Sequence, residues 1–292
     1  MSILKEQRVS VVIPAYNEVE TIGEIGTAIK QAVGADTEVI VVNDGSQDAT
    51  GQMASGAGAI VINHPYNKGN GAAVKAGIRQ ATGDIIVLMD GDGQHDPADI
   101  PKLLEKMGTY DMVVGARAGR FSGPIHRRLA NWIYNDFATY LARVKVLDLT
   151  SGFRAIKKDV IKSFLYLLPN TFSYPSTCTM ALLRAGYSVD YAPIHIRKRS
   201  GKSKIHLVRD GARFFLILFR IATLFAPFRV FLPTSAIISF GGIAYSLDTI
   251  ISMHRFTNMG MLLIVTGILL FFMGLIAEEI AMMRMERSEG NR

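Results

Sequence analysis

Apolar residues follow two different periods along the first part of the chain, and the two periods alternate. Short apolar runs typical of buried strands are followed by segments with apolar residues three or four positions apart, the spacing of a helix with one buried face. Such alternation predicts an α/β fold in which helices cover a mostly parallel sheet. The predicted strands are 9–13, 38–43, 59–63, 84–89, 111–115 and 187–196, and the predicted helices are 18–33, a segment from about 48, and 69–81.

The pattern changes after this region. Residues 117–187 look helical and less regular, and two long apolar runs, Val230–Leu247 and Met259–Ala277, close the chain. Each run is about long enough to cross the core of a bilayer as a helix. The short polar loop at 252–258 suits a helical hairpin. Two buried helices of a soluble core are the alternative.

The charges around these runs are unequal. Basic residues flank their outer ends, whereas the connecting loop carries only His254 and Arg255. The positive-inside bias therefore predicts a multi-pass protein of the cell membrane with both termini and the α/β domain in the cytoplasm. The predicted parts are an α/β domain at 1–205, amphipathic interfacial helices at 206–228, and a region at 229–292 with membrane helices at about 230–250 and 259–281 and a short tail.

Composition narrows the class of partner. The 292 residues carry a formal net charge of +7, and 49% of them are hydrophobic. A basic protein suits an anionic partner, and the basic residues crowd 197–229, just before the apolar runs. That position favours a membrane surface or lipid phosphate over nucleic acid, for which no reading motif is present. The single cysteine, Cys178, excludes an internal disulfide.

The strand at 84–89 runs directly into two acidic residues, Asp90 and Asp92. Open α/β sheets bind ligands at the carboxyl ends of their strands, and side chains two positions apart on an extended segment point the same way. Two carboxylates so close together favour a divalent cation with oxygen ligands. The alternative is a polar turn whose aspartates cap backbone groups, as Asp96 before Pro97 would do at a helix start.

Three further segments are candidates for contact with a nucleotide. The motif PAYNE follows the first strand and offers a ring and an acceptor, and NDGS follows the second strand. The glycine-rich NKGNGAA precedes a helix whose N-terminus could contact phosphate. Each also has a purely structural interpretation, with Asn17 as a helix cap or Asp44-Gly45 as a turn. The candidate contacts are Pro14, Tyr16, Glu18, Asp44, Lys68 and Gly71.

The order of these motifs carries a resemblance. PAYNE, VVNDGSQDAT, NKGNGAAVKAG and LMDGDGQHDP, in register over the first hundred residues, resemble the inverting family 2 glycosyltransferases of GT-A fold. Further on, GAR at 115–117, the arginine pair at 127–128, DLTSGFR at 148–154 and RSGKSK at 199–204 resemble the polyprenyl-phosphate hexose synthases, which include dolichol-phosphate mannose synthase. The resemblance covers roughly residues 9–205.

The resemblance implies a role for each matching position. Two positions depart from the pattern: Asn131 stands where relatives often have serine, and SYPSTCTMALL lacks a glutamate that relatives often carry. The implied roles are nucleoside contact for Tyr16, Glu18 and Asp44; metal and diphosphate binding for Asp90, Asp92 and Gln94; acceptor-phosphate binding for Arg117 and Arg127, with Asn131 beside them; and closure over the diphosphate for Arg199 and Lys204.

The reaction implied by the resemblance is inverting transfer of a hexose from a UDP- or GDP-sugar to a polyprenyl phosphate, dolichyl or undecaprenyl. It would take place at the cytoplasmic face of the membrane with Mg²⁺ or Mn²⁺, and Asp90, Asp92, Arg117 and Arg127 would be catalytic. Two alternatives stay open: a membrane glycosyltransferase acting on a hydroxyl acceptor, either a glycan or a glycerolipid, and an inactive nucleotide-sugar binder docked on the membrane. Assembly into a homo-oligomer also stays open.

Overall fold

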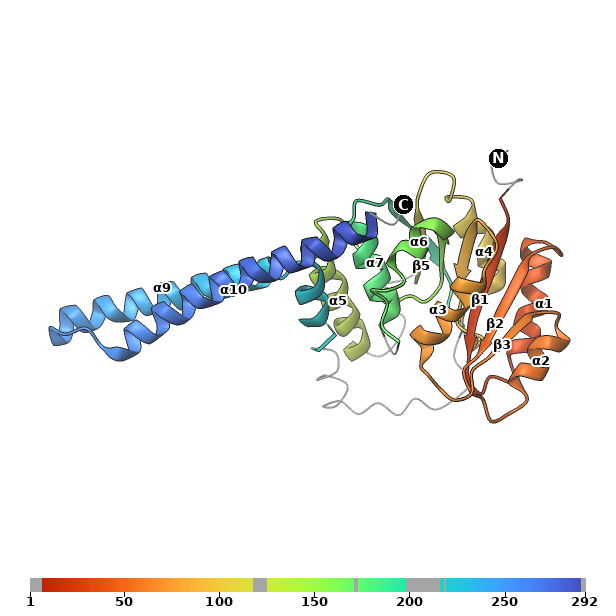
Figure 1. Cartoon of the computed structure of the whole chain (residues 1–292), viewed down its shortest axis with the longest axis horizontal. Coiled ribbons are helices and arrows are strands. Elements are labelled where there is room, and N and C mark those ends of the chain that lie inside the picture. Colours follow the sequence, from red (N-terminus) through yellow and green to blue (C-terminus); the bar gives the residue numbers. More distant parts are fainter. Residues whose placement is uncertain (1–6, 118–124, 171–172, 198–215, 218, 290–292) are drawn as a thin grey trace. The chain divides into compact units, whose positions relative to one another are not determined.

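The first part of the chain folds around one seven-stranded sheet (Figure 1). The computed structural model describes residues 7–117, 125–170, 173–197, 216–217 and 219–289, with the backbone alone for 125–130 and 285–289. The chain divides into two compact units, 1–205 and 206–292. The strands are β1 (Val9–Ala15), β2 (Glu38–Asn43), β3 (Ile60–Asn63), β4 (Ile85–Leu88), β5 (Met112–Arg117), β6 (Arg154–Lys157) and β7 (Val189–Ile194), in the spatial order β3-β2-β1-β4-β6-β5-β7.

The sheet is mostly parallel, which confirms the predicted α/β class. Only β6 runs antiparallel, and it lies between β4 and β5. The sequence did not predict β6, because its four residues, RAIK, begin and end with a cation and show no strand-like alternation. Arg154 is nevertheless fully buried in this strand. The six predicted strands are all present, with ends shifted by no more than two residues.

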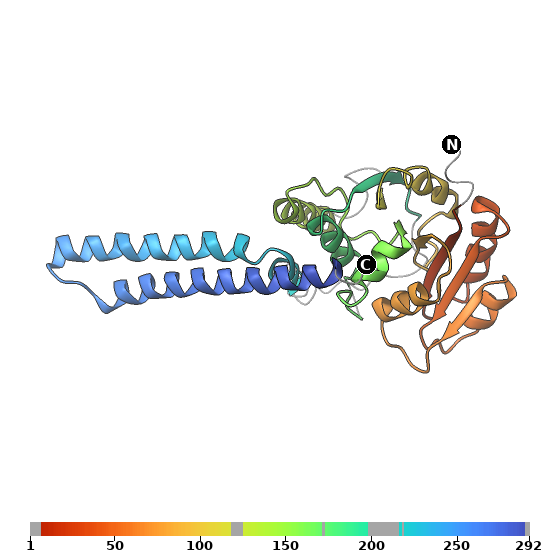
Figure 2. The same ribbon diagram turned by 45° about the horizontal axis from the view of Figure 1, so that its top comes forward.

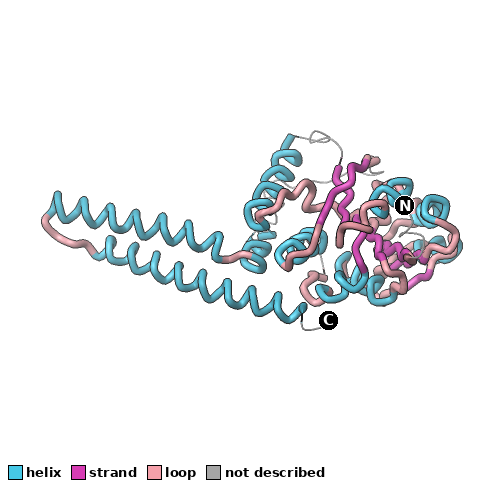
Figure 3. The backbone as a smooth tube through the Cα atoms, turned by 90° about the horizontal axis from the view of Figure 1, so that it is seen from above, coloured by secondary structure: helices cyan, strands magenta, loops and turns pink. Residues whose placement is uncertain are grey.

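Helices lie on both faces of the sheet, so that in Figure 3 the strands run between them. The first helix begins at Ile22 rather than at 18, because Asn17 has a left-handed backbone (φ 56°) and the turn after it closes on the Glu18 carbonyl. The helices of this unit are α1 (Ile22–Val33), α2 (Thr50–Gly56), α3 (Asn70–Gln80), α4 (Ile100–Leu104), α5 (Ile125–Ala142), α6 (Lys158–Phe164) and α7 (Tyr174–Arg184), with a 3₁₀ turn, η2, at Pro97–Asp99.

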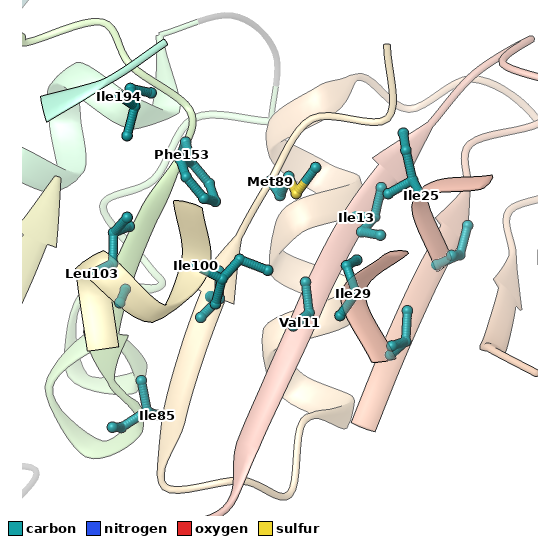
Figure 4. Packing of buried hydrophobic residues seen from close by; sticks show 14 of the residues in the cluster. Val11, Ile13, Ile25, Ile29, Ile85, Met89, Ile100, Leu103, Phe153 and Ile194 are labelled. Atoms are coloured by element: carbon teal, nitrogen blue, oxygen red, sulfur yellow. The ribbon is translucent and has the colours of Figure 1, made fainter. Parts of the chain in front are cut away.

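Alternating side chains of the strands form a core on each face. On one face, Val11 and Ile13 of β1 pack with α1 and α4 through residues such as Ile29 and Ile100 (Figure 4). On the other face α3 approaches β1 so closely that a Cβ on Gly77 would overlap the Val12 side chain. Strand β4 is buried over its whole length, as expected for a strand covered on both sides.

The strand order determines where a ligand would bind. The chain runs from β1 outward to β2 and β3, then returns to add β4 on the other side of β1. The reversal makes the carboxyl ends of β1 and β4 a topological switch point, the place where open α/β sheets bind ligands. Pro14 lies at the end of β1, and Asp90 and Asp92 follow β4. The fold therefore brings two of the candidate segments to one place.

The second unit contains two long antiparallel helices (Figure 2), α9 (Phe228–Met253) and α10 (Asn258–Glu289). Both are long and apolar enough to cross a membrane, and only 17% of each apolar window is buried within the structure. Glycines of α10 meet serines of α9: a Cβ on Gly260 would overlap Ser246, and one on Gly267 would overlap Ser239. The predicted hairpin is confirmed. In the predicted interfacial segment, 206–228, residues 206–215 and 218 lie outside the described residues, and residues 219–225 are helical.

Candidate active site

Asp90 and Asp92 lie in a tight turn at the carboxyl end of β4. The turn is fixed by the residue before α1, because Thr21 Oγ1 donates to the Gly91 carbonyl at 2.6 Å, and from within, because the Gln94 amide donates to Asp92 Oδ1 at 3.2 Å. Asp96 caps the next turn by accepting from the Ala98 amide at 3.1 Å, as the sequence predicted. The carboxylate that caps the start of the next helical turn is therefore that of Asp96, and not that of Asp90.

Two segments from elsewhere in the chain meet the Asp90 carboxylate. The side-chain amide of Asn70, the first residue of α3, donates a hydrogen bond to it. Behind it lies Gly152 of the DLTSGFR segment, so close that a Cβ there would be 2.5 Å from Asp90 Oδ2. Thus the glycine-rich segment, the acidic turn and the DLTSGFR segment form one site.

The electrostatics of this turn are those of a crowded, partly buried acidic pair. Burial raises the pKa of Asp90; the nearby charge of His95 opposes this rise and that of Asp92 adds to it. Burial lowers the pKa of His95, whose ring stacks on Phe153 with centroids 5.2 Å apart. Negative charge held this close favours a bound cation.

The donor set fits Mg²⁺ or Mn²⁺ together with a diphosphate. Among the described residues no group of three or more His, Cys, Asp or Glu side chains could hold a metal by itself. Mg²⁺ is usually held by only one or two carboxylates together with substrate phosphates. Asp90 and Asp92 supply two carboxylates, and the N-terminus of α3 beside them is suited to anions. The remaining ligands would then come from the substrate and water.

The loops after β1 and β2 are tied to each other. The Asn17 amide donates to Ser46 Oγ at 3.0 Å, and Asn17 Oδ1 accepts from the Gln47 amide at 3.0 Å. Asn17 therefore joins two loops instead of capping α1. The Glu18 amide donates to Thr50 Oγ1 at 2.9 Å, and the Tyr16 ring is 42% exposed. Tyr16 is thus available to a ligand at the switch point, as its predicted role requires.

Asp44 is buried and anchors the glycine-rich segment. Its carboxylate accepts from the backbone amides of Lys68 and Gly69, at 3.0 and 2.8 Å, and lies 2.6 Å from His64 Nδ1. Gly45, with a φ of 74°, lets the turn pass against the backbone of Tyr66. The predicted contact between Asp44 and the nucleoside stays a prediction, but the structure gives Asp44 a further task, which is to hold the loop that leads into α3.

Lys68 and Gly71 border the N-terminus of α3. The Lys68 ammonium lies over the Tyr66 ring, 5.7 Å from its centroid, and Gly71 is buried in the first turn of the helix. The Ala72 amide donates to the Asn170 carbonyl at 2.8 Å, and Lys75 Nζ donates to the Leu168 carbonyl at 3.0 Å. The start of α3 is therefore fixed, and Asn70, which lies between the two predicted residues in the sequence, reaches Asp90 of the acidic turn.

Arg117, at the end of β5, is held by an acidic partner. Its Nε donates to Asp148 Oδ2 at 2.7 Å and its Nη2 donates to Asp148 Oδ1 at 2.8 Å and to Thr150 Oγ1. These bonds raise the pKa of Arg117. Burial alone would raise the pKa of Asp148, but the bonds and charge of Arg117 outweigh it, so that the pKa of Asp148 is lowered. The forked pair fixes the plane of the guanidinium beside the DLTSGFR segment.

The other predicted phosphate-binding residues are described less fully. Arg127 lies in α5, where only its backbone is described, and Asn131 follows one turn later, half-buried. Arg199 and Lys204 lie outside the described residues. The chain leading to them starts beside the acidic turn, because the Arg197 amide donates to the Gln94 carbonyl at 3.0 Å and its guanidinium pairs with Asp96 at 2.5 Å.

Sequence reasoning missed the residues behind Asp90. Gly152 was noticed only as part of a motif, and its close approach depends on β6, which was not predicted. Arg154 is fully buried and donates to the Pro175 carbonyl at 2.8 Å, to Thr179 Oγ1 at 3.1 Å and to the Ser151 carbonyl. A Gly in a loop and an Arg at the start of a short strand that the sequence did not predict carry no signal of this packing.

Two family models match the chain. Residues 10–165 match "Glycosyl transferase family 2", and residues 226–283 match "GtrB C-terminal hairpin". An undecaprenyl-phosphate mannosyltransferase of Micrococcus luteus is 29% identical over 68% of this chain and 87% of its own length. An undecaprenyl-phosphate 4-deoxy-4-formamido-L-arabinose transferase of an Enterobacter species is 30% identical over 69% of this chain and 64% of its own length.

Solved structures share the fold. Glucosyl-3-phosphoglycerate synthase from Mycobacterium tuberculosis, in complex with Mn²⁺, UDP and phosphoglyceric acid, superposes with a TM-score of 0.61. The sequences are 22% identical, and the match covers 75% of this chain and 78% of that one. The likeness confirms the predicted GT-A arrangement of the sheet.

Proposed function

The chain belongs to glycosyl transferase family 2, and from that premise we propose that it transfers a hexose from a UDP- or GDP-sugar to a polyprenyl phosphate, with inversion at the anomeric carbon. The observation that carries this proposal is the coexistence of the acidic turn at the switch point and the apolar hairpin in one chain. A water-soluble donor would bind at the sheet edge, while a lipid acceptor stays in the membrane.

On the donor side, each segment has one task. Tyr16, Glu18 and Asp44 would hold the nucleoside, supported by the bonds that join their loops. Asp90 and Asp92, with Gln94 beside them, would hold a divalent cation, which supplies neutralisation of the departing diphosphate. Lys68 and the start of α3 would contact the phosphates, with Arg199 and Lys204 closing over them.

On the acceptor side, Arg117, Arg127 and Asn131 would hold the lipid phosphate. The fork of Arg117 is fixed by Asp148, so its orientation is set before a phosphate arrives. A phosphate monoester has a second pKa of about 6 and is mostly dianionic at neutral pH, so no residue has to remove a proton from the attacking oxygen. A hydroxyl acceptor would require such a base.

The hairpin makes the protein a membrane protein, and we further propose that both termini face the cytoplasm. The support is the excess of arginines outside the two membrane helices over the loop between them, which has only His254 and Arg255. The catalytic unit would then meet nucleotide sugars on the side where they are made. Assembly of several copies is compatible with this arrangement and forms no part of the proposal.

The test is a glycolipid assay on the purified full chain. We expect labelled sugar to appear in undecaprenyl phosphate with one member of a panel of UDP- and GDP-hexoses, to require Mg²⁺ or Mn²⁺, and to be absent when diacylglycerol replaces the phosphate. Asp92→Ala should abolish transfer, whereas Asp36→Ala, at an exposed acidic residue away from the site, should not. Transfer to diacylglycerol, or full activity of Asp92→Ala, would overturn the proposal.

A further inference from the structure

Helix α5 has apolar residues on two sides. It buries one side against the rest of the unit through Tyr134, Ala138 and Leu141. Because a surface helix normally turns polar residues outward, an apolar outer side is unusual. The outer side and the loop after the helix expose five large apolar residues by 38–61%; we call this set the α5 surface: Trp132, Ile133, Tyr140, Val144 and Leu147.

The loop that completes this surface has a defined structure. Arg143 ends the helix in a left-handed conformation (φ 60°), and the Val146 amide donates to Thr139 Oγ1 at 3.0 Å. Asn135 Nδ2 donates to the Leu147 carbonyl at 2.6 Å. These bonds bury Val146 and hold its neighbours outward, so the exposure of Val144 and Leu147 is built into the fold.

Two exposed cations, Arg143 and Lys145, alternate with the apolar residues of the loop. Tryptophan and tyrosine with nearby Lys and Arg are typical of protein surfaces that lie among lipid headgroups. Rings with one polar edge suit that boundary, and the cations suit anionic lipids. The chemistry of the α5 surface therefore points to a bilayer rather than to a polar protein partner.

The α5 surface is continuous with the acceptor side of the site. Leu147 is followed by Asp148, which holds Arg117 in its forked pair. Asn135 joins the two, since its Oδ1 also accepts from the Leu149 amide at 3.0 Å. A lipid whose phosphate reaches Arg117 would therefore have its chain near the α5 surface.

We propose that the α5 surface docks the catalytic unit on the headgroup region of a bilayer containing anionic lipid, so that the acceptor phosphate reaches Arg117 from the membrane. This inference rests on the proposed function, because it needs a lipid acceptor at Arg117. It adds a second membrane contact to the hairpin. The hairpin anchors the chain, and the α5 surface would orient the site.

The chain carries its own reporter, because Trp132 is its only tryptophan. The full chain is placed in phosphatidylglycerol-containing vesicles with and without lipids brominated just below the headgroup. We expect the brominated lipid to reduce Trp132 emission roughly twofold, since interfacial surfaces are buried about 5–10 Å deep. Aqueous iodide should quench the emission less than it does in the absence of lipid. Unchanged Trp132 emission with full access to iodide would overturn the proposal. Protection from iodide without quenching by brominated lipid would also overturn it, and would indicate that a second copy or another protein covers the surface.

Two variants control the experiment. Trp132→Phe combined with Met53→Trp moves the reporter to α2, which packs on β2 and β3 at the far end of the sheet, and should remove quenching by brominated lipid. Arg143→Glu with Lys145→Glu should at least halve the quenching of Trp132, and unchanged quenching would overturn the recognition of anionic lipid. Glycolipid formation in detergent is measured in parallel. Loss of Trp132 quenching with intact sugar transfer would refute the docking alone. Quenching of Trp132 by brominated lipid without sugar transfer would refute the proposed function alone.

Discussion

The replacement Gly152→Ala tests whether the DLTSGFR segment sets the position of Asp90. Gly152 lies behind the carboxylate, with a hypothetical Cβ 2.5 Å from Oδ2, 3.1 Å from Cγ and 3.2 Å from Oδ1. The backbone at Gly152 is not in the left-handed region, so alanine causes no strain of its own there. The whole effect of the substitution would come from one methyl group meeting one side chain.

The size of the effect follows from that distance. Ordinary contact begins at 3.4 Å, so the carboxylate or the segment must move by about 1 Å. A misplacement of about 1 Å in a catalytic arrangement can lower the rate about 100-fold, while overpacking costs about 1–3 kcal/mol of stability. We therefore expect kcat to fall about 100-fold in a protein that still folds, with weaker binding of Mn²⁺.

The assay combines glycolipid formation with Mn²⁺ binding, measured by electron paramagnetic resonance in the presence of the nucleotide. Gly108→Ala is the matched control, because no atom lies within 4 Å of a Cβ at that glycine, and it should match the unmodified protein in both measurements. Gly152→Ala protein with unchanged kcat and Mn²⁺ affinity would refute the reasoning, since Asp90 would then not depend on the segment behind it.

Two further predictions concern stability. Asp148→Asn should lower the unfolding temperature at pH 7, because Arg117 loses a charged partner. The expected loss in the free energy of unfolding is roughly 1–3 kcal/mol. Because the folded-state pKa of Asp148 lies below its ordinary value, its contribution is present above about pH 4 and is lost as the pH falls through the folded-state pKa, so the difference between the two unfolding temperatures should shrink as the pH falls below about 4. In the hairpin, the leucine of Gly267→Leu should overlap Ser239 and lower the free energy of unfolding by about 1–3 kcal/mol. Gly241→Leu, at a glycine with open space around it, should leave thermal unfolding unchanged. Equal effects of the two substitutions would contradict the packing of the helices.

The sequence predicted those parts of the fold whose signal is local. Strand β2 is predicted to the residue and the starts of the two hairpin helices to within two residues, because a continuous apolar run bounded by polar residues is visible without any tertiary contact. Strand β6 is invisible for the opposite reason. Its burial depends on β4 and β5 on either side, and its first residue is an arginine.

The same distinction applies to the site. Asp90 and Asp92 could be predicted because they directly follow a strand whose carboxyl end must face the ligand. What supports Asp90 could not be predicted, since Asn70 and Gly152 reach it from segments far away in the chain. The structural alternative for Asn17 was a helix cap, and the structure instead gives it bonds to the neighbouring loop that depend on the pairing of β1 with β2.

Asp90 is partly buried and has no ion-pair partner among the described residues, so the groups around it decide how far burial raises its pKa. Arg154 is fully buried, yet its hydrogen bonds go to neutral acceptors, two backbone carbonyls and Thr179 Oγ1. The charge of His95, the hydrogen bond from the Asn70 side chain and the charge of Arg154, in that order of size, oppose the rise in the pKa of Asp90 that burial causes. Because a direct salt bridge would occupy the carboxylate oxygens, charges that act without direct contact oppose the rise in the pKa of Asp90 without occupying those oxygens. Arg154 thus acts on the acidic turn from within the buried strand β6, without a hydrogen bond to the Asp90 carboxylate.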